Sequence, residues 1–236
     1  MKKLLFFILI FISIRVSAQM YQEQGDKYPI IADENKYIVS GFIAFNGLGD
    51  ETIFSNALLW AIDNISPKMR ENLNNINVKE KSFEAAITIA SIAGSGVNNT
   101  YHCKAIFRVA NEKLVYHISN ITLESSGLLN SKLIPFESFN PQKKENHKIA
   151  MEDFTASESL MLNKLFDFIL TNKIPTITHW EEIGKQKAIK GMNETECKLA
   201  FGKPQDIQDN GTEIQWMYTS SFYLFFKNNL LDTIIK

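Results

Sequence analysis

The sequence predicts an α+β protein in which an antiparallel sheet carries two helices on one face, followed by a small domain of one helix and a strand meander. Three features of the sequence support this prediction. Apolar and polar residues alternate with a period of two between residues 76 and 125. Segments 50–65 and 155–172 instead repeat their apolar residues at helical spacing. The order of one helix and then strands begins again after residue 188.

The first 18 residues predict a secretory signal peptide. Lys2 and Lys3 precede the apolar run LLFFILIFISI, and the small residues VSA end at Ala18. A membrane anchor is the alternative, but the run is shorter than the roughly 18 apolar residues that a spanning helix needs, and no later segment reaches that length. We therefore expect cleavage before Gln19, a periplasmic or secreted protein, a polar leader over 19–35, and no transmembrane segment after signal removal.

The charge balance argues against nucleic acid as a partner. Lys and Arg number 25 against 26 Asp and Glu, which gives a formal net charge of -1. Without Lys2, Lys3 and Arg15 in the signal, the balance becomes still more acidic. Binding to nucleic acid or to anionic lipid requires clustered basic residues, and no such cluster is visible in the sequence.

The block 36–172 is expected to form the larger domain. Residues 36–45 are rich in β-branched and aromatic residues and predict a strand. Asp50 is placed to cap the helix that follows, and Pro67 ends it. The alternating region then predicts a meander, with GSGVNN (94–99) as a hairpin loop and KLIPF as an edge piece that tolerates proline.

A two-residue turn at Asn111 and Glu112 would set the register of the central hairpin. Phe107 then lies opposite Tyr116, Ile106 opposite His117, and His102 opposite Ile121.

The second long helix is predicted over 155–172, after a charged loop at 140–148. Thr155 and Glu158 have capping-box spacing at its start. Pro175 cannot continue the helix, so residues 173–187 are expected to be a linker.

The last residues, 188–236, predict a second and smaller domain. Asn193 can cap a short helix, Gly202 is placed to end it in the left-handed conformation, and Pro204 prevents its continuation. Three strands follow, EIQWMYT, SFYLFFK and LLDTIIK, and the pair Asn228–Asn229 suits a primed turn between the last two.

This C-terminal segment looks like the SmpA/OmlA, or BamE-like, envelope family over residues 189–235. In that family a Gly-Met opens the helix, a Gly-x-Pro closes it, and a Trp-x-Tyr strand leads to an aromatic strand. The matching residues are Gly191, Met192, Gly202, Pro204, Trp216, Tyr218 and Phe225. The resemblance implies an accessory role at the envelope, such as outer-membrane assembly or integrity. The chain departs from BamE, a lipoprotein, because no cysteine stands at the expected cleavage site.

The N-terminal block is similar in pattern to exported bacterial proteins that carry a domain of unknown function with a TBP-like fold. The resemblance covers the helix DETIFSNALLWAIDNI, the meander and the last helix. It implies a fold and no DNA binding, because no basic stripe accompanies it.

No motif in the sequence predicts catalysis, a cofactor or a metal. The four histidines lack metal-ligand spacing with one another, with cysteine or with carboxylates. Alternation places Cys103 on the apolar face of its strand, and Cys197 shares a helix face with Ala200 and Phe201. We expect two buried, unpaired thiols, with a disulfide as the alternative that export permits.

The C-terminal aromatic residues are the stronger functional signal. Trp216 and Tyr218 are expected on one strand face, and Tyr223 and Phe225 on the face of the next strand opposite Phe222. A two-layer domain buries only one face against its helix, so some aromatics must contact the first domain, a partner or water. The leading hypothesis is a non-enzymatic envelope protein that binds a protein partner. The alternatives are a secreted hydrolase using carboxylates and a carrier of a small ligand or lipid between the domains.

Overall fold

The computed structural model describes residues 37–92, 98–126 and 131–236. The predicted signal peptide, cleavage site and leader lie outside these residues, as does most of the predicted loop 94–99. The described chain is α+β with two antiparallel sheets, which confirms the predicted fold class. No helix within the described ranges has both the length and the apolarity to cross a membrane.

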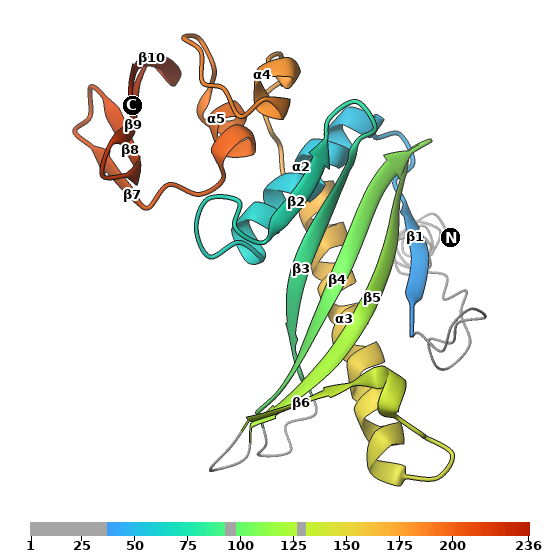
Figure 1. Cartoon of the computed structure of the whole chain (residues 1–236). Coiled ribbons are helices and arrows are strands. Elements are labelled where there is room, and N and C mark those ends of the chain that lie inside the picture. The colour runs from blue at the N-terminus through green and yellow to red at the C-terminus, as the bar shows by residue number, and fades with distance from the viewer. Residues whose placement is uncertain (1–36, 93–97, 127–130) are drawn as a thin grey trace, which may run out of the picture.

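The larger sheet has the order β1-β5-β4-β3-β2, with β6 paired to the far part of β5 (Figure 1). Its strands are β1 (Val39–Ala44), β2 (Leu73–Asn77), β3 (Ser82–Ala90), β4 (Asn98–Ala110), β5 (Lys113–Ser126) and β6 (Ser131–Pro135). Strand β6 is an edge strand, as predicted for KLIPF, and it ends at Pro135. The short strand β2 was not predicted, because only Leu73 of its residues is buried and the alternation signal is therefore weak.

The central hairpin has the predicted register near its turn and a different one farther away. Phe107 lies opposite Tyr116 and Ile106 opposite His117. Beyond Lys104 a bulge adds one residue to β5, where Asn120 has a φ of 54°, so His102 lies opposite Thr122 and not Ile121. The prediction for His102 was wrong because it assumed unbroken alternation.

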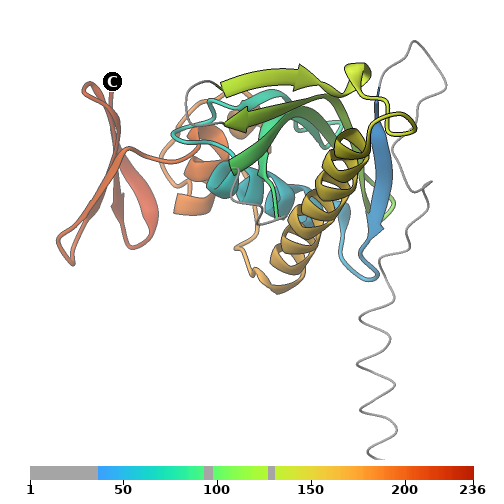
Figure 2. The ribbon, with the colours of Figure 1, turned by 90° about the horizontal axis from the view of Figure 1, so that it is seen from below.

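Two helices, α2 (Asp50–Asn64) and α3 (Glu145–Thr171), lie on the same side of the curved sheet (Figures 1 and 2). Every residue of α2 from Ile53 to Ile62 is buried, because α2 contacts α3 and α5 as well as the sheet. Asp50 does not cap this helix. Its carboxylate accepts hydrogen bonds from the backbone N–H groups of Asn111 and Glu112 and so holds the β4–β5 turn.

The start of α3 corrects the sequence prediction. The helix begins at Glu145, ten residues before Thr155, and the short 3-10 turn η1 (Phe136–Ser138) precedes it. The Thr155 hydroxyl donates to the carbonyl of Met151 inside the helix and caps nothing. The first turns are helical because Met151 and Phe154 continue the buried stripe, and Phe154 packs against the ring of Tyr101.

The C-terminal elements are α4 (Trp180–Gly184), α5 (Glu194–Phe201), β7 (Asp206–Asp209), β8 (Ile214–Thr219), β9 (Phe222–Lys227) and β10 (Leu230–Ile235). Helix α4 lies in the predicted linker and was not expected. The sheet has four strands in the order β10-β9-β8-β7, one more than predicted. The additional strand β7 was missed because every one of its residues is exposed, so it shows no apolar alternation. Helices α4 and α5 lie between the two sheets (Figures 1 and 2).

Candidate functional site

The inner face of the C-terminal sheet is a packed core. Trp216, Tyr218, Leu224 and Phe226 are buried, and the ring of Phe201 on α5 packs edge-on against Tyr218 and Phe222. Alternation places these side chains together, as predicted for Trp216 and Tyr218. Both residues are therefore scaffold and are not available to a partner.

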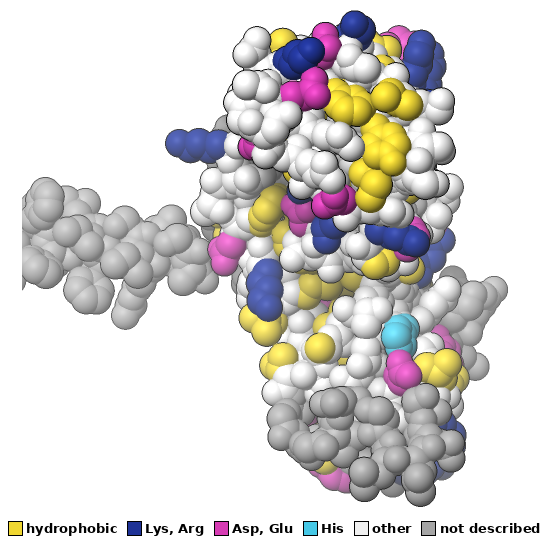
Figure 3. All heavy atoms as spheres, turned by 90° about the vertical axis from the view of Figure 1, so that its left-hand side faces the viewer, with side chains coloured by type: hydrophobic (Ala, Val, Ile, Leu, Met, Phe, Trp, Pro, Cys, Tyr) yellow, Lys and Arg dark blue, Asp and Glu magenta, His cyan; other side chains and the backbone are white. Residues whose placement is uncertain are grey.

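The outer face of the same sheet also carries large apolar side chains. Phe225 pairs with Gln215 and Thr233, and Tyr223 pairs with Met217 and Ile235. We call Met217, Tyr223, Phe225 and Ile235 the outer aromatic face. Ile235 is 49% exposed and the other three are half-buried. Figure 3 shows hydrophobic side chains gathered on this part of the surface, with charged side chains around them.

Gly191 and Met192 join the helix to the sheet. Gly191 N donates to the carbonyl of Leu231, and the Met192 carbonyl accepts from Leu231 N. Gly191 has a φ of 91°, a conformation in which a side chain is strained, and the Met192 side chain is completely buried. The Gly-Met pair therefore holds the start of α5 against the edge of β10.

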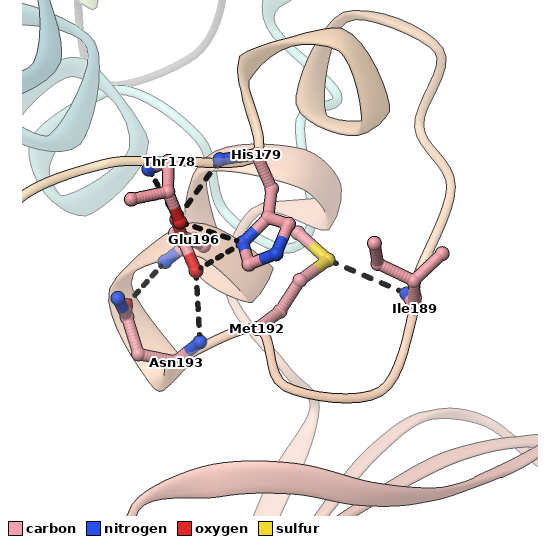
Figure 4. A network of polar contacts seen from close by, with 6 residues as sticks. All are labelled: Thr178, His179, Ile189, Met192, Asn193 and Glu196. Atoms are coloured by element: carbon pink, nitrogen blue, oxygen red, sulfur yellow. Dashed lines mark hydrogen bonds and ion pairs between the residues drawn. The ribbon is translucent and has the colours of Figure 1, made fainter.

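Asn193 and Glu196 form the capping box that begins α5 (Figure 4). The Asn193 side chain accepts from Glu196 N at 2.9 Å, and a Glu196 carboxylate oxygen accepts from Asn193 N at 2.9 Å. The predicted cap is confirmed.

Glu196 also binds the segment that precedes α4. Its carboxylate accepts from the backbone N–H groups of Thr178 at 2.6 Å and His179 at 3.1 Å, and from the Thr178 hydroxyl at 3.0 Å. Nδ1 of His179 lies 2.9 Å from the other carboxylate oxygen (Figure 4). The buried carboxylate thus joins α5 to residues 178 and 179.

The pKa of Glu196 reflects this environment. Burial alone would raise it, but the hydrogen bonds donated by Thr178, Asn193 and His179 outweigh burial, and the pKa is lowered below the ordinary value of 4.5. The ionised form is therefore the one the fold stabilises.

Gly202 ends α5 in direct contact with the backbone of Met69. It has a φ of 82° and a ψ of -156°, which is a glycine conformation but not the predicted left-handed helical one. A Cβ at this position would lie 1.8 Å from the carbonyl oxygen of Met69. The glycine is required because the backbone of residue 69, beyond α2, packs directly on it.

Lys203 and Arg70 lie at the same contact, and each donates hydrogen bonds to carbonyls of the other part of the chain. Lys203 Nζ donates to the carbonyls of Asp63 at 2.5 Å and Ser66 at 3.3 Å, at the end of α2. Arg70 Nη2 donates to the carbonyl of Leu199, at the end of α5. Burial lowers the pKa of Arg70 to about 10, with a smaller opposing effect from Tyr218. Within the described residues no carboxylate pairs with this buried guanidinium.

The histidines do not gather into one site. On the open face of the larger sheet, His102 Nε2 lies 2.7 Å from Glu124 Oε2 and Nδ1 lies 3.4 Å from the hydroxyl of Thr88. This hydroxyl, imidazole and carboxylate row lies on a surface where the strand N–H groups are used in the ladder, so those groups are not free to stabilise an oxyanion. The described residues contain no group of three His, Cys, Asp or Glu side chains placed to hold a metal.

Both cysteines, Cys103 in β4 and Cys197 in α5, are buried and free. Burial, with a contribution from Glu158, raises the pKa of Cys103 to about 12. Burial also raises the pKa of Cys197, with smaller contributions from Glu196 and Glu194. Neither thiol is an activated nucleophile.

Sequence reasoning missed the contacts that hold the C-terminal elements in place. The sequence indicated no role for Lys203, which lies between Gly202 and Pro204, or for Arg70, which lies in no motif. Asn193 was predicted as the cap of α5, but its reciprocal bonding with Glu196 was not, and no local signal indicated that Glu196 also binds Thr178 and His179.

The chain matches no protein-family model and no curated protein. Two solved structures are similar to it. A TBP-like protein from Parabacteroides distasonis has a TM-score of 0.49 and 13% identity, over 63% of this chain and 100% of its own. A DUF4468 family protein from Bacteroides ovatus has a TM-score of 0.42 and 11% identity, over 64% of this chain and 94% of its own. At these scores the likeness carries no functional argument, and the α+β architecture rests on the strand pairing described above.

Proposed function

We propose that the chain is a non-enzymatic exported envelope protein whose C-terminal sheet binds a protein partner through the outer aromatic face. The observation that carries the proposal is the position of Tyr223 and Phe225, on the side of the sheet away from α5. Aromatic side chains on a rigid strand face are typical anchors of protein interfaces, since they offer large apolar area and lose little entropy on binding. A partly exposed apolar group of this kind, surrounded by charged residues, is typical of an interaction site.

The envelope location rests on the sequence. The signal pattern of residues 1–18 favours export, and the BamE-like order of Gly191, Met192, Gly202 and Pro204 favours an accessory role in envelope assembly or integrity. In this proposal the motif residues have a structural role, and the outer aromatic face is the surface that binds the partner.

The carrier alternative is weaker on structural grounds. An apolar ligand between the sheets would need an apolar cavity where they meet. The contact described above consists instead of a backbone pairing between Met69 and Lys203 and of the cations Arg70 and Lys203 bound to helix carbonyls.

Site-specific photocrosslinking in the native cells tests the proposal. A benzophenone amino acid placed at Phe225 or at Tyr223 is expected to yield the same covalent protein adduct in the envelope fraction. The matched control is Val115, a 43% exposed apolar residue on the open face of the larger sheet, which is expected to yield no such adduct.

A substitution on the same face tests whether the crosslinked protein binds this face or only lies near it. Met217→Lys should abolish the adduct formed from position 225 while leaving the thermal unfolding midpoint nearly unchanged, because Met217 lies on the outer face. No adduct, an adduct only from Val115, or an adduct that persists with Met217→Lys would exclude this face as the binding surface. A full-length chain that stays in the cytoplasm would exclude export.

A further inference from the structure

The C-terminal ends of α2 and α5 each bind a cationic side chain that comes from beyond the end of the other helix. Arg70 follows the end of α2 and binds a carbonyl in the last turn of α5, whereas Lys203 follows the end of α5 and binds a carbonyl in the last turn of α2. The backbones between them pair in both directions, since Met69 N donates to the Lys203 carbonyl and Lys203 N to the Met69 carbonyl. We call these three residues and their carbonyl partners the reciprocal clasp.

Electrostatic attraction between the cations and the helix ends stabilises this arrangement. The last carbonyls of a helix have no partner within the helix and carry partial negative charge, so a nearby cation stabilises them. Here each helix receives its cation from beyond the end of the other helix. A further contact, the ion pair of Lys198 with Asp63 at 2.6 Å, stabilises the same junction.

These hydrogen bonds exist only while the two parts of the chain are in contact. If the C-terminal segment moved away, Arg70 would lose the Leu199 carbonyl, and the carbonyls of Asp63 and Ser66 would lose Lys203. Water would replace these bonds, but the favourable field of each helix end would be lost. Residues 188–236 are also near the lower size limit for independent folding.

We propose that the reciprocal clasp couples the two sheets into one cooperatively folding unit, so that the C-terminal sheet neither swings nor unfolds separately under native conditions. Gly202 permits the backbone contact, and Arg70 and Lys203 hold it by opposite and interdependent bonds. The inference does not depend on partner binding at the outer aromatic face.

Hydrogen exchange along a urea titration of the full chain tests the coupling. In the unsubstituted protein, amides of β8 and β9 are expected to become unprotected at the same urea concentration as amides of β4 and β5. In Lys203→Met and in Arg70→Met, β8 and β9 should open first, with exchange about tenfold to a hundredfold faster than in β4 and β5. The double variant should add little to either single one, because the bonds act as one unit.

Two controls separate the clasp from general effects. Lys190→Met removes another lysine of the same segment, whose distance to Asp232 is 3.9 Å, and should leave one common transition. Lys203→Arg keeps the cation and should also keep one transition. Separate transitions in the unsubstituted protein, equal effects of Lys203→Met and Lys190→Met, or multiplied effects in the double variant would overturn the proposal.

Discussion

The two sheets share a plan, with helices on one face and the other face open, but their open faces differ. On the larger sheet most outward side chains are polar and pair with one another across strands. The pairs are Lys104–Glu84, His102–Glu124, Arg108–Glu80 and Ser40–His117. Large apolar side chains on this face include Phe42, Val115, Ile106 and Leu133, and the ammonium of Lys113 covers the ring of Phe42 at 4.6 Å.

On the C-terminal sheet the centre of the open face is apolar. Tyr223 and Phe225 lie side by side, with ring centroids 6.5 Å apart, and the ion pairs of Lys227 lie toward one end. A sheet face that is solvated in isolation is expected to resemble the first pattern. The second pattern is the one expected of a face that binds the proposed partner. Substitutions at the junction and on both faces of the C-terminal sheet test the difference between the two sheets.

The largest expected effect is the loss of the junction that holds the C-terminal sheet. Gly202→Ala would place a methyl group against the backbone of Met69, and we expect a loss of more than about 3 kcal/mol of unfolding free energy. Chemical denaturation measures it. Gly211→Ala is the matched control, because its φ of 83° is similar but nothing lies within 4 Å of the added carbon. It should cost about 1–2 kcal/mol. Equal losses would show that close approach is not the reason for Gly202.

The next effect distinguishes the two faces of the C-terminal sheet. Trp216→Ala removes a buried ring that packs on Phe226 with centroids 4.9 Å apart, so it should cost about 3–5 kcal/mol of stability. Phe225→Ala, on the outer face, should cost under about 1 kcal/mol. Thermal unfolding of both variants checks the difference. A Phe225 variant as unstable as the Trp216 variant would contradict the assignment of an outer face.

A smaller effect concerns the carboxylate that links α5 to the segment before α4. Glu196→Gln should lower stability by about 1–3 kcal/mol at neutral pH, because the carboxylate accepts bonds from Thr178, His179 and Asn193. Since the folded-state pKa is lowered, the ionised group contributes stability above the ordinary value of 4.5, and that contribution is lost as the pH falls below it.

The stability curves of the original and Gln proteins should therefore converge on acidification, as followed by denaturation at several pH values. Glu181→Gln, on the exposed face of α4, is the control and should leave stability nearly unchanged. Curves that run parallel from neutral to acid pH would show that ionisation of Glu196 has no part in the stabilisation.

The smallest effect is on thiol reactivity, for which each sheet region offers one probe. In the native protein at pH 8, Cys103 and Cys197 should react very slowly with an alkylating reagent, because both are buried and their pKa values are raised. Thiol titration of the denatured, unreduced protein should find both groups free. A result of no free thiol would establish a disulfide instead.

Local sequence patterns predicted much of the scaffold. The helix over 50–65, the β4–β5 turn and the cap at Asn193 are set by neighbours in the chain, so they could be predicted from the sequence. The turn at Asn228 and Asn229 is of the same kind, with φ values of 52° and 63°. Periodicity failed where burial is weak or uneven. It missed the exposed strand β7, and it started α3 too late because a charged segment precedes the buried stripe.

The sequence by itself determined which residues favour helix, strand and turn, and that the C-terminal segment holds more aromatic residues than one core face can bury. Only the tertiary structure decided which aromatics face outward, that Glu196 binds His179, and that Gly202 meets Met69. The physical reason is distance along the chain. Gly202 and Met69, like Arg70 and Leu199, lie more than a hundred residues apart, and no local propensity records a contact that forms only when both sheets have folded.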